Sequence, residues 1–187
     1  MDIWKYYDGD LKYPNVTMYS HEKEIAKATP KWAFDYVSKH GKDKELEPII
    51  AKDSKYSYQY AIDILHSKTF KLGEPAIAKN PYYSFNYAKH ILKGEFPLGE
   101  PAIAKDMEFS YLYAKDILKN KPFKLGEPAI AKDPYYSYRY AKIILNGPFK
   151  LGEPIMANYE QCASAYTQYV LKKDFYLDGK LICKYEG

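Results

Sequence analysis

Cysteine, histidine and arginine are scarce in this chain of 187 residues. The two cysteines, Cys162 and Cys183, fit neither a disulfide framework nor a zinc pattern, which favours a reducing, cytoplasmic compartment. None of the four histidines has metal-ligand spacing to a carboxylate or cysteine, and no serine or cysteine lies in a nucleophile elbow. We therefore expect no catalytic residues, no metal site, no cofactor and no enzymatic activity.

Arg139 is the only arginine, and every other basic residue is lysine. Bidentate recognition of phosphate or guanine favours arginine, so this bias argues against a protein built around such contacts. The formal net charge of +4 lies in residues 47–153 and is weaker than a nucleic-acid-binding stripe. Apolar runs are short and the first residues lack a signal-peptide pattern, so we expect neither secretion nor a membrane partner.

A tandem repeat organises most of the sequence. Its unit begins with Glu-Pro, which recurs five times at spacings of 27, 26, 27 and 26 residues. A degenerate copy begins at Glu22 and a degenerate last copy begins at Glu153, so six copies cover residues 22–173. The Glu-Pro pairs are Glu47-Pro48, Glu74-Pro75, Glu100-Pro101, Glu127-Pro128 and Glu153-Pro154.

The sequence pattern of each copy predicts a short helix followed by a longer one. The proline suits a first helical position, and a capping residue (Thr29, Asp53, Asn80, Asp106 or Asp133) follows about a turn later. The second helix is expected to run for about twelve residues, with Gly94 or Gly147 as a left-handed C-cap. Its central residue is a serine in the four middle copies, which lets neighbouring helices approach closely. The predicted fold class is mainly α, a short-unit helical-repeat solenoid.

Both ends of the chain are predicted to form small β-hairpins. Asp8-Gly9 and Asp178-Gly179 each lie between β-forming residues, and Asp-Gly in that setting favours a tight hairpin turn. Solenoid ends need caps because a terminal repeat otherwise exposes an apolar face. We expect a single domain over residues 1–187, with caps at 1–21 and 174–187. Pairing of hairpins between two chains is the alternative, so both a monomer and a hairpin-mediated dimer are open.

Exposed positions of the long helix that differ between copies form a first candidate surface. Positions identical in every copy are explained by stacking, whereas variable ones are where a partner surface can be encoded. Apolar, aromatic or charged residues there indicate protein binding, and scattered exposed side chains without a function are the alternative. The candidate protein-binding residues are Ile62, Tyr82, His90, Leu112, Tyr135, Arg139 and Ile143.

A ladder of lysines, one per copy, forms the second candidate surface. Stacked at the repeat spacing, these lysines are candidates for tracking the phosphates of single-stranded nucleic acid, with tyrosines stacking on the bases. The alternative is that they are solvated, or neutralised by the nearby repeated glutamates. The glutamates themselves are interpreted as helix-start residues rather than catalytic carboxylates. The ladder consists of Lys52, Lys79, Lys105 and Lys132.

Read from Glu74, the unit is EPAIAKNPYYSFNYAKHILKGEFPLG. It resembles a family of tandem repeats in uncharacterised proteins of bacteriophages and large DNA viruses, in which Glu-Pro, Ile-Ala-Lys-Asp-Pro, Tyr-Ala-Tyr and Leu-Lys-Gly-Arg-Phe recur in this order. The resemblance covers about residues 22–173, with Ser in place of Ala and Lys or Pro in place of Arg. It implies no activity, but it does imply a viral origin, and hence a tyrosine-rich phage protein in the host cytoplasm.

Three functional hypotheses follow. The first is a non-catalytic binding protein that docks a host protein, with inhibition of a defence or replication factor as the version that the viral resemblance suggests. A rigid solenoid suits this role because its surface is preformed and loses little entropy on binding. The second is single-stranded nucleic-acid binding along the lysine ladder, and the third is a structural homo-oligomer.

Overall fold

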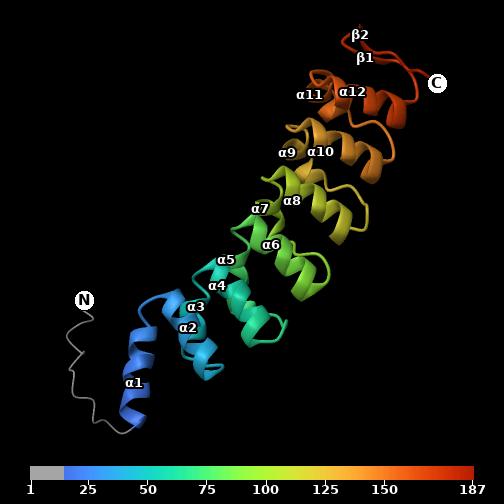
Figure 1. Cartoon of the computed structure of the whole chain (residues 1–187). Coiled ribbons are helices and arrows are strands. Elements are labelled where there is room, and N and C mark those ends of the chain that lie inside the picture. The colour runs from blue at the N-terminus through green and yellow to red at the C-terminus, as the bar shows by residue number, and fades with distance from the viewer. Residues whose placement is uncertain (1–14) are drawn as a thin grey trace.

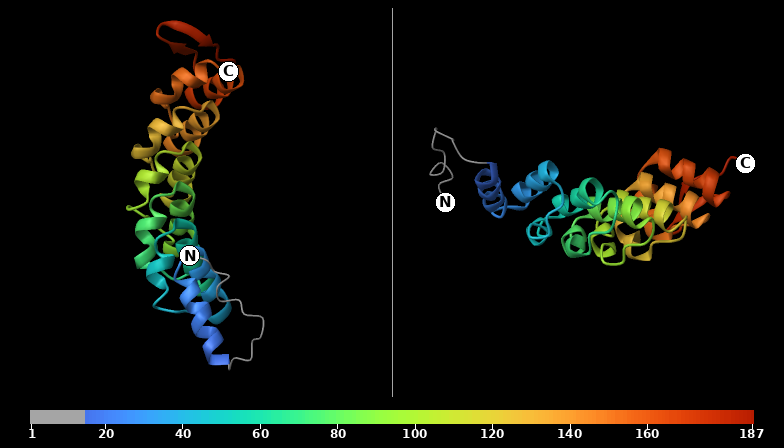
Figure 2. Two further views of the ribbon diagram at one scale, coloured as in Figure 1. Left: turned by 90° about the vertical axis from the view of Figure 1, so that its left-hand side faces the viewer. Right: turned by 90° about the horizontal axis from the view of Figure 1, so that it is seen from below.

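The computed structural model describes residues 15–187, and the side chains of residues 21–187. The molecule is an elongated, gently curved rod in which helical units stack in chain order from one end to the other (Figures 1 and 2). Each unit contributes a short helix and a longer one, and the short helices follow one edge of the rod. The prediction of a mainly α helical-repeat solenoid is confirmed.

The first copy is formed by α1 (Asn15–Ala26) and α2 (Pro30–His40). In the later copies, the longer α-helix continues directly into a π-helical segment, which the sequence did not predict. The short helices are α3 (Glu47–Ile50), α5 (Glu74–Ile77), α7 (Glu100–Ile103), α9 (Glu127–Ile130) and α11 (Glu153–Ala157). The longer helices and their π-helical continuations are α4 (Ser54–Gln59, then Tyr60–Ile64), α6 (Pro81–Tyr87, then Ala88–Leu92), α8 (Met107–Leu112, then Tyr113–Ile117), α10 (Pro134–Arg139, then Tyr140–Leu145) and α12 (Glu160–Tyr166, then Thr167–Leu171).

The N-caps that the sequence predicts are confirmed. Each capping side chain accepts a hydrogen bond from the backbone N–H three residues further on, at 2.9 to 3.2 Å. These bonds satisfy backbone donors that have no partner inside the helix, and so they fix where each longer helix begins. The capping residues are Thr29, Asp53, Asn80, Asp106 and Asp133.

The C-terminal ends of the longer helices differ from the prediction. Lys93 and Asn146 adopt the left-handed conformation, with φ of 53° and 46°, whereas Gly94 and Gly147 do not. The backbone N–H of Lys93 bonds to the Ala88 carbonyl five residues earlier. This hydrogen bond spans five residues, as in a π-helix, whereas the predicted α-helix has bonds that span four. The chain therefore reverses one residue before the glycine.

The return loop explains why the repeat alternates between 26 and 27 residues. The shorter copies reverse through one left-handed residue, Lys93 or Asn146. The longer copies use two in succession, His66–Ser67 and Lys119–Asn120. The extra residue is thus absorbed in the loop, and the stacking of the helices is preserved.

Neighbouring copies approach most closely at small residues, as predicted. Ser110, in the middle of α8, is fully buried, and its Oγ donates a hydrogen bond to the Ile103 carbonyl at 3.0 Å. A Cβ added to Gly126, which directly precedes the next short helix, would lie 2.6 Å from the Ser110 Cβ. The same contact occurs between Ser57 and Gly73, Ser84 and Gly99, and Ser137 and Gly152.

Gly126→Ala is expected to lower the free energy of unfolding by about 1–3 kcal/mol, because the added methyl group must displace the packed Ser110 and Phe123 side chains. Urea denaturation followed by circular dichroism measures the loss. Gly147→Ala is the matched control, since the space around that glycine is open and its φ lies outside the left-handed region. Equal losses in the two variants would contradict the close-contact explanation.

The C-terminal hairpin is present. Strands β1 (Phe175–Leu177) and β2 (Lys180–Cys183) pair antiparallel. Asp178 and Gly179 between them have φ of 49° and 78°, as a two-residue hairpin turn with positive φ at both positions requires. The Phe175 ring packs on Tyr166 at a centroid distance of 5.4 Å. The hairpin therefore covers the last copy of the solenoid.

The N-terminal hairpin predicted around Asp8-Gly9 lies outside the described residues. From Asn15 the chain is helical, so residues 15–21 of the predicted cap belong to α1. No helix between residues 15 and 187 is long and apolar enough to cross a bilayer.

Candidate functional site

The repeated glutamates take part in hydrogen bonds that hold the stack together. The Tyr113 hydroxyl donates to Glu100 Oε1 at 2.9 Å and accepts from the Phe96 backbone N–H at 2.8 Å. Phe96 lies in the return loop of the preceding copy, so one hydroxyl group links two copies. The same two bonds join Phe70, Tyr87 and Glu74; Phe123, Tyr140 and Glu127; and Phe149, Tyr166 and Glu153.

These tyrosines are fully buried, and Tyr60 of the second copy also donates to its glutamate, Glu47. Burial raises the pKa of all five phenols above their usual value, and the adjacent carboxylates raise it further. Each glutamate also begins a short helix, as the sequence predicts. The repeated carboxylates therefore contribute to the stacking of the copies.

Three of these glutamates are paired with lysines of the return loop and not with lysines of the ladder. Their Nζ atoms lie 3.0 Å from the carboxylates, in the pairs Lys71–Glu74, Lys124–Glu127 and Lys150–Glu153. The ladder residues Lys52, Lys79, Lys105 and Lys132 are exposed, and within the described part of the chain they form no ion pair. The sequence left open whether the repeated glutamates neutralise the ladder; in the structure none of them pairs with a ladder lysine, and Glu74, Glu127 and Glu153 pair with loop lysines instead.

The predicted protein-binding residues do not share one environment. Tyr82 and Tyr135 are about half exposed, at 51% and 52%, Ile143 is exposed at 38%, and His90 is also exposed. In contrast, the side chains of Ile62 and Leu112 are half-buried and pack against the core. Their assignment to the open surface is corrected, because the neighbouring helices and the π-helical turn cover more of the long helix than an ideal α-helix predicts.

Arg139 is held between two tyrosines. The central carbon of its guanidinium group lies 4.9 Å from the Tyr111 ring centroid and 5.2 Å from that of Tyr135. Its Nη1 donates a hydrogen bond to the Tyr135 hydroxyl at 2.8 Å. Tyr111 is a buried residue of α8, whereas Tyr135 and Arg139 lie on α10. The only arginine of the chain is thus fixed where two copies meet. In the sequence, the four-residue spacing of Tyr135 and Arg139 was the only feature that could have predicted their contact.

Aromatic rings also connect the long helices of successive copies. Their centroids lie 5.7 to 5.8 Å apart. These contacts engage five of the tyrosines in packing between copies. The ring pairs are Phe34–Tyr56, Tyr58–Tyr83, Phe85–Phe109 and Tyr111–Tyr136.

A row of exposed leucines, one in each of the last four copies, was missed in the sequence. Identical positions were attributed to stacking, yet these leucines are 51–54% exposed and stand just before the short helices. The leucine belongs to the repeated Leu-Gly-Glu-Pro motif, which is visible in the sequence. In the structure the glycine and glutamate of this motif are buried or half-buried, whereas the leucine is exposed. The leucine row consists of Leu72, Leu98, Leu125 and Leu151.

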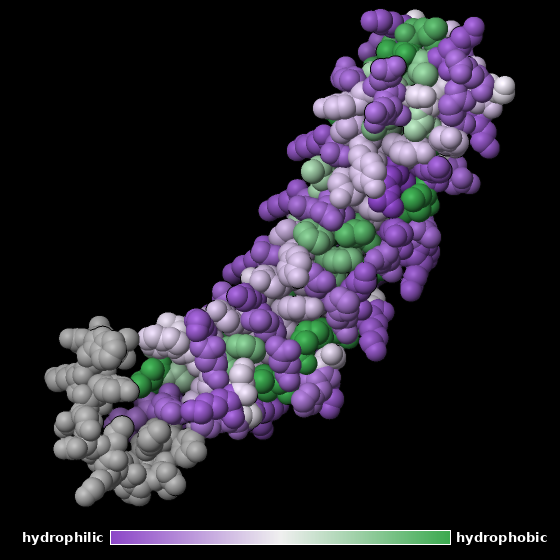
Figure 3. Space-filling model, in the orientation of Figure 1, coloured by the Kyte–Doolittle hydropathy of each residue, from purple (hydrophilic) through white to green (hydrophobic). Residues whose placement is uncertain are grey.

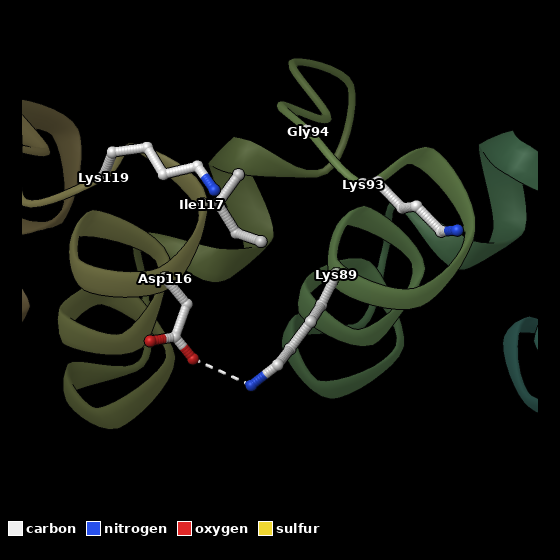
Figure 4. Close-up of a pocket in the computed structure, with 6 residues that line it drawn as sticks. All are labelled: Lys89, Lys93, Gly94, Asp116, Ile117 and Lys119. Carbon is white, nitrogen blue, oxygen red and sulfur yellow. Dashed lines mark hydrogen bonds and ion pairs between the residues drawn. The ribbon is translucent and has the colours of Figure 1, made fainter.

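A pocket of about 150 Å³ lies between the C-terminal ends of two long helices (Figure 4). Lys89 and Asp116 form an ion pair of 2.8 Å across it and so join two copies. Lys93 and Lys119 complete its charged lining. All four side chains are exposed or half-exposed, so the pocket offers no buried polar group for a ligand.

No three His, Cys, Asp or Glu side chains are grouped to hold a metal ion in the part of the chain that the structure describes. Comparisons with protein-family models, curated proteins and solved structures found no match. The class of protein that the fold and its surfaces define is a tandem helical-repeat protein, rich in tyrosine, with recurring Tyr–Glu hydrogen bonds.

Proposed function

We propose that this protein is a non-catalytic binding protein that recognises another protein through the exposed side of its long helices. The observation that carries the proposal is the placement of Arg139 against Tyr111 and Tyr135. Tyrosine and arginine are the side chains that most often dominate the energy of protein interfaces. Because this arginine is already fixed by two rings, its immobilisation on binding costs little additional entropy.

Neighbouring copies extend this surface, which we call the tyrosine face (Tyr82, Tyr135, Arg139, Ile143 and Tyr169). Residues 135, 139 and 143 follow one another at a spacing of four along α10 and its continuation, which brings them to one side. Tyr169 is 63% exposed, and the Lys142 Nζ lies 4.5 Å from its ring centroid. Figure 3 shows small apolar areas among polar side chains along the rod.

The partner that fits the resemblance of the repeat to phage and viral proteins is a protein of the infected host. We propose that binding inhibits a host defence or replication factor in the host cytoplasm. This step rests on the resemblance alone, whereas the tyrosine face rests on the contacts described above.

Arg139→Ala is expected to reduce capture of the partner at least about tenfold, because truncation of a central interface arginine commonly costs 2 kcal/mol or more. Tagged protein is incubated with nuclease-treated host lysate at low and high salt, and retained proteins are quantified by mass spectrometry. Leu125→Ala is the matched control, since Leu125 lies on the short-helix edge. If the parent and both variants retain the same proteins in equal amounts, the tyrosine face is not the binding surface.

Single-stranded nucleic-acid binding along Lys52, Lys79, Lys105 and Lys132 is the second candidate function. The absence of ion pairs at these lysines within the described residues favours it. The engagement of the tyrosine rings between copies weighs against it, because sequence-tolerant binding of single strands relies on exposed aromatic platforms.

A further inference from the structure

One edge of the rod presents the same three exposed residues in successive copies. In the third copy they are Leu72, Pro75 and Lys79, and all three are exposed. Leu72 lies in the turn directly before the short helix α5, Pro75 lies within it, and Lys79 lies in the turn directly after it. Ala76 and Ile77, which lie between them in the sequence, are buried against the core. The other triplets of this leucine–lysine edge are Leu98, Pro101 and Lys105; Leu125, Pro128 and Lys132; and, without the lysine, Leu151 and Pro154.

Packing between the copies does not explain why the same leucine occurs at this position in four copies. One exposed position on the long helix has diverged: the position of Tyr82 is occupied by Lys55, Glu108 and Tyr135 in other copies. The leucine is the same in four copies, although about half of its surface is open to solvent in each. A residue kept for stacking would be buried, as Ser110 and Gly126 are. An identical exposed apolar residue therefore indicates contact with something that offers the same chemistry to every copy.

The charge of this edge restricts what that partner is. The ammonium-bearing side chains of Lys71, Lys124 and Lys150 are 75–78% exposed, whereas those of the glutamates paired with them are 5–14% exposed. The lysines thus face solvent with their counter-ions behind them. The unpaired positive charge of the edge comes from Lys79, Lys105 and Lys132, which form no ion pair within the described residues. A second copy of the chain would present the same charge and be repelled.

We propose that the leucine–lysine edge docks on an anionic lipid surface. A bilayer interface offers apolar chains and anionic headgroups at every point along a line, so it meets each copy with the same chemistry. Leucines inserted at the headgroup boundary and lysines near the anionic groups form a known combination for peripheral attachment. An acidic protein segment would need its own matching repeat, and a nucleic acid gains little from leucine.

This attachment is peripheral and needs no helix that crosses the bilayer. The short helices follow one edge of the rod in Figure 1, and polar side chains project along that edge in Figure 3. Because each leucine directly precedes a short helix, the leucines recur along the same edge, as contact with an extended surface requires. Our sequence-based expectation of no membrane partner considered only spanning segments, and this edge is a different kind of membrane contact.

Vesicle co-sedimentation tests the proposal with the full chain. One set of vesicles is phosphatidylcholine alone, and the other contains about one third phosphatidylglycerol, enough to give an anionic surface. The parent protein is expected to partition at least about tenfold more strongly to the anionic vesicles at low ionic strength. A parent protein that stays in the supernatant with both vesicle types overturns the proposal.

Two variants test the leucines and lysines separately. Leu98→Ser with Leu125→Ser is expected to weaken partitioning about tenfold or more, because two apolar anchors are lost. Lys79→Gln, Lys105→Gln and Lys132→Gln together are expected to weaken it on the order of a hundredfold at low ionic strength and less at high. Circular dichroism checks that each variant is folded.

Tyr135→Ser is the matched control, and it is expected to bind vesicles as the parent does, because Tyr135 lies on the tyrosine face. A leucine variant that partitions like the parent overturns the proposal, since lysines alone would then explain adsorption. A parent protein that prefers a single-stranded oligonucleotide to anionic vesicles in direct competition also overturns it and moves the lysine ladder to nucleic-acid binding.

Discussion

Tyr113→Phe is expected to lower the free energy of unfolding by about 2–4 kcal/mol, although it removes only one oxygen atom. The lost hydroxyl accepts from the Phe96 backbone N–H and donates to the Glu100 carboxylate. Phe96 is 3% exposed, so its N–H group is left without a partner and away from water. No lysine occupies the loop position before Glu100, where Pro97 stands, so that carboxylate also loses its hydrogen-bond donor.

Urea denaturation and hydrogen exchange of the Phe96 amide measure this effect. Tyr60→Phe is the matched control, because Tyr60 donates to Glu47 but links no preceding return loop within the described residues, and Lys42 also pairs with Glu47. Its cost is expected to be about 1 kcal/mol. Equal costs for the two variants, with unchanged exchange at Phe96, would show that the bond between copies contributes nothing.

The protein is expected to unfold cooperatively as the pH rises above about 10. Burial and the neighbouring carboxylates raise the pKa of the five tyrosines that bind the repeated glutamates. In the unfolded chain a tyrosine ionises at about pH 10, so above that pH the folded state binds more protons than the unfolded state. The stability from these groups is therefore complete below pH about 10 and is lost as the pH climbs toward the raised values.

Far-ultraviolet circular dichroism and the near-ultraviolet absorbance of tyrosinate follow the transition together. The five buried phenols are expected to ionise in one step with the loss of helical signal, because ionisation removes the donor to each glutamate and places two anions in contact. If all 22 tyrosines ionise while the helical signal is unchanged, the assignment of the buried hydroxyls is wrong.

Local signals in the sequence were sufficient for the architecture. The Glu-Pro period defined the copies, and the capping side chains at Asp53, Asn80, Asp106 and Asp133 defined the helix starts. Asp178-Gly179 defined the terminal turn. Such features depend on neighbours close in the chain or on the repeat itself, so one sequence is enough to find them.

The candidate surfaces were predicted less well. A helical wheel with α-helical spacing placed Ile62 and Leu112 on the open face, whereas both pack against the core. It also gave no indication that the long helices of the later copies end as π-helices, whose wider turn changes the direction of the side chains. The tyrosine face therefore retains Tyr82, Tyr135, Arg139 and Ile143 from the prediction and gains Tyr169 from the structure.

The sequence by itself determined the repeat, the order of short and long helices, and the small residues at which copies meet. Only the tertiary structure decided which glutamates bind which lysines, that Tyr113 links two copies, and that Leu98 and its equivalents face solvent. The physical reason is that these outcomes depend on how one copy is placed against the next. The stacking of the copies determines which face of each helix the neighbouring copy covers, and the spacing of residues along the chain does not determine it.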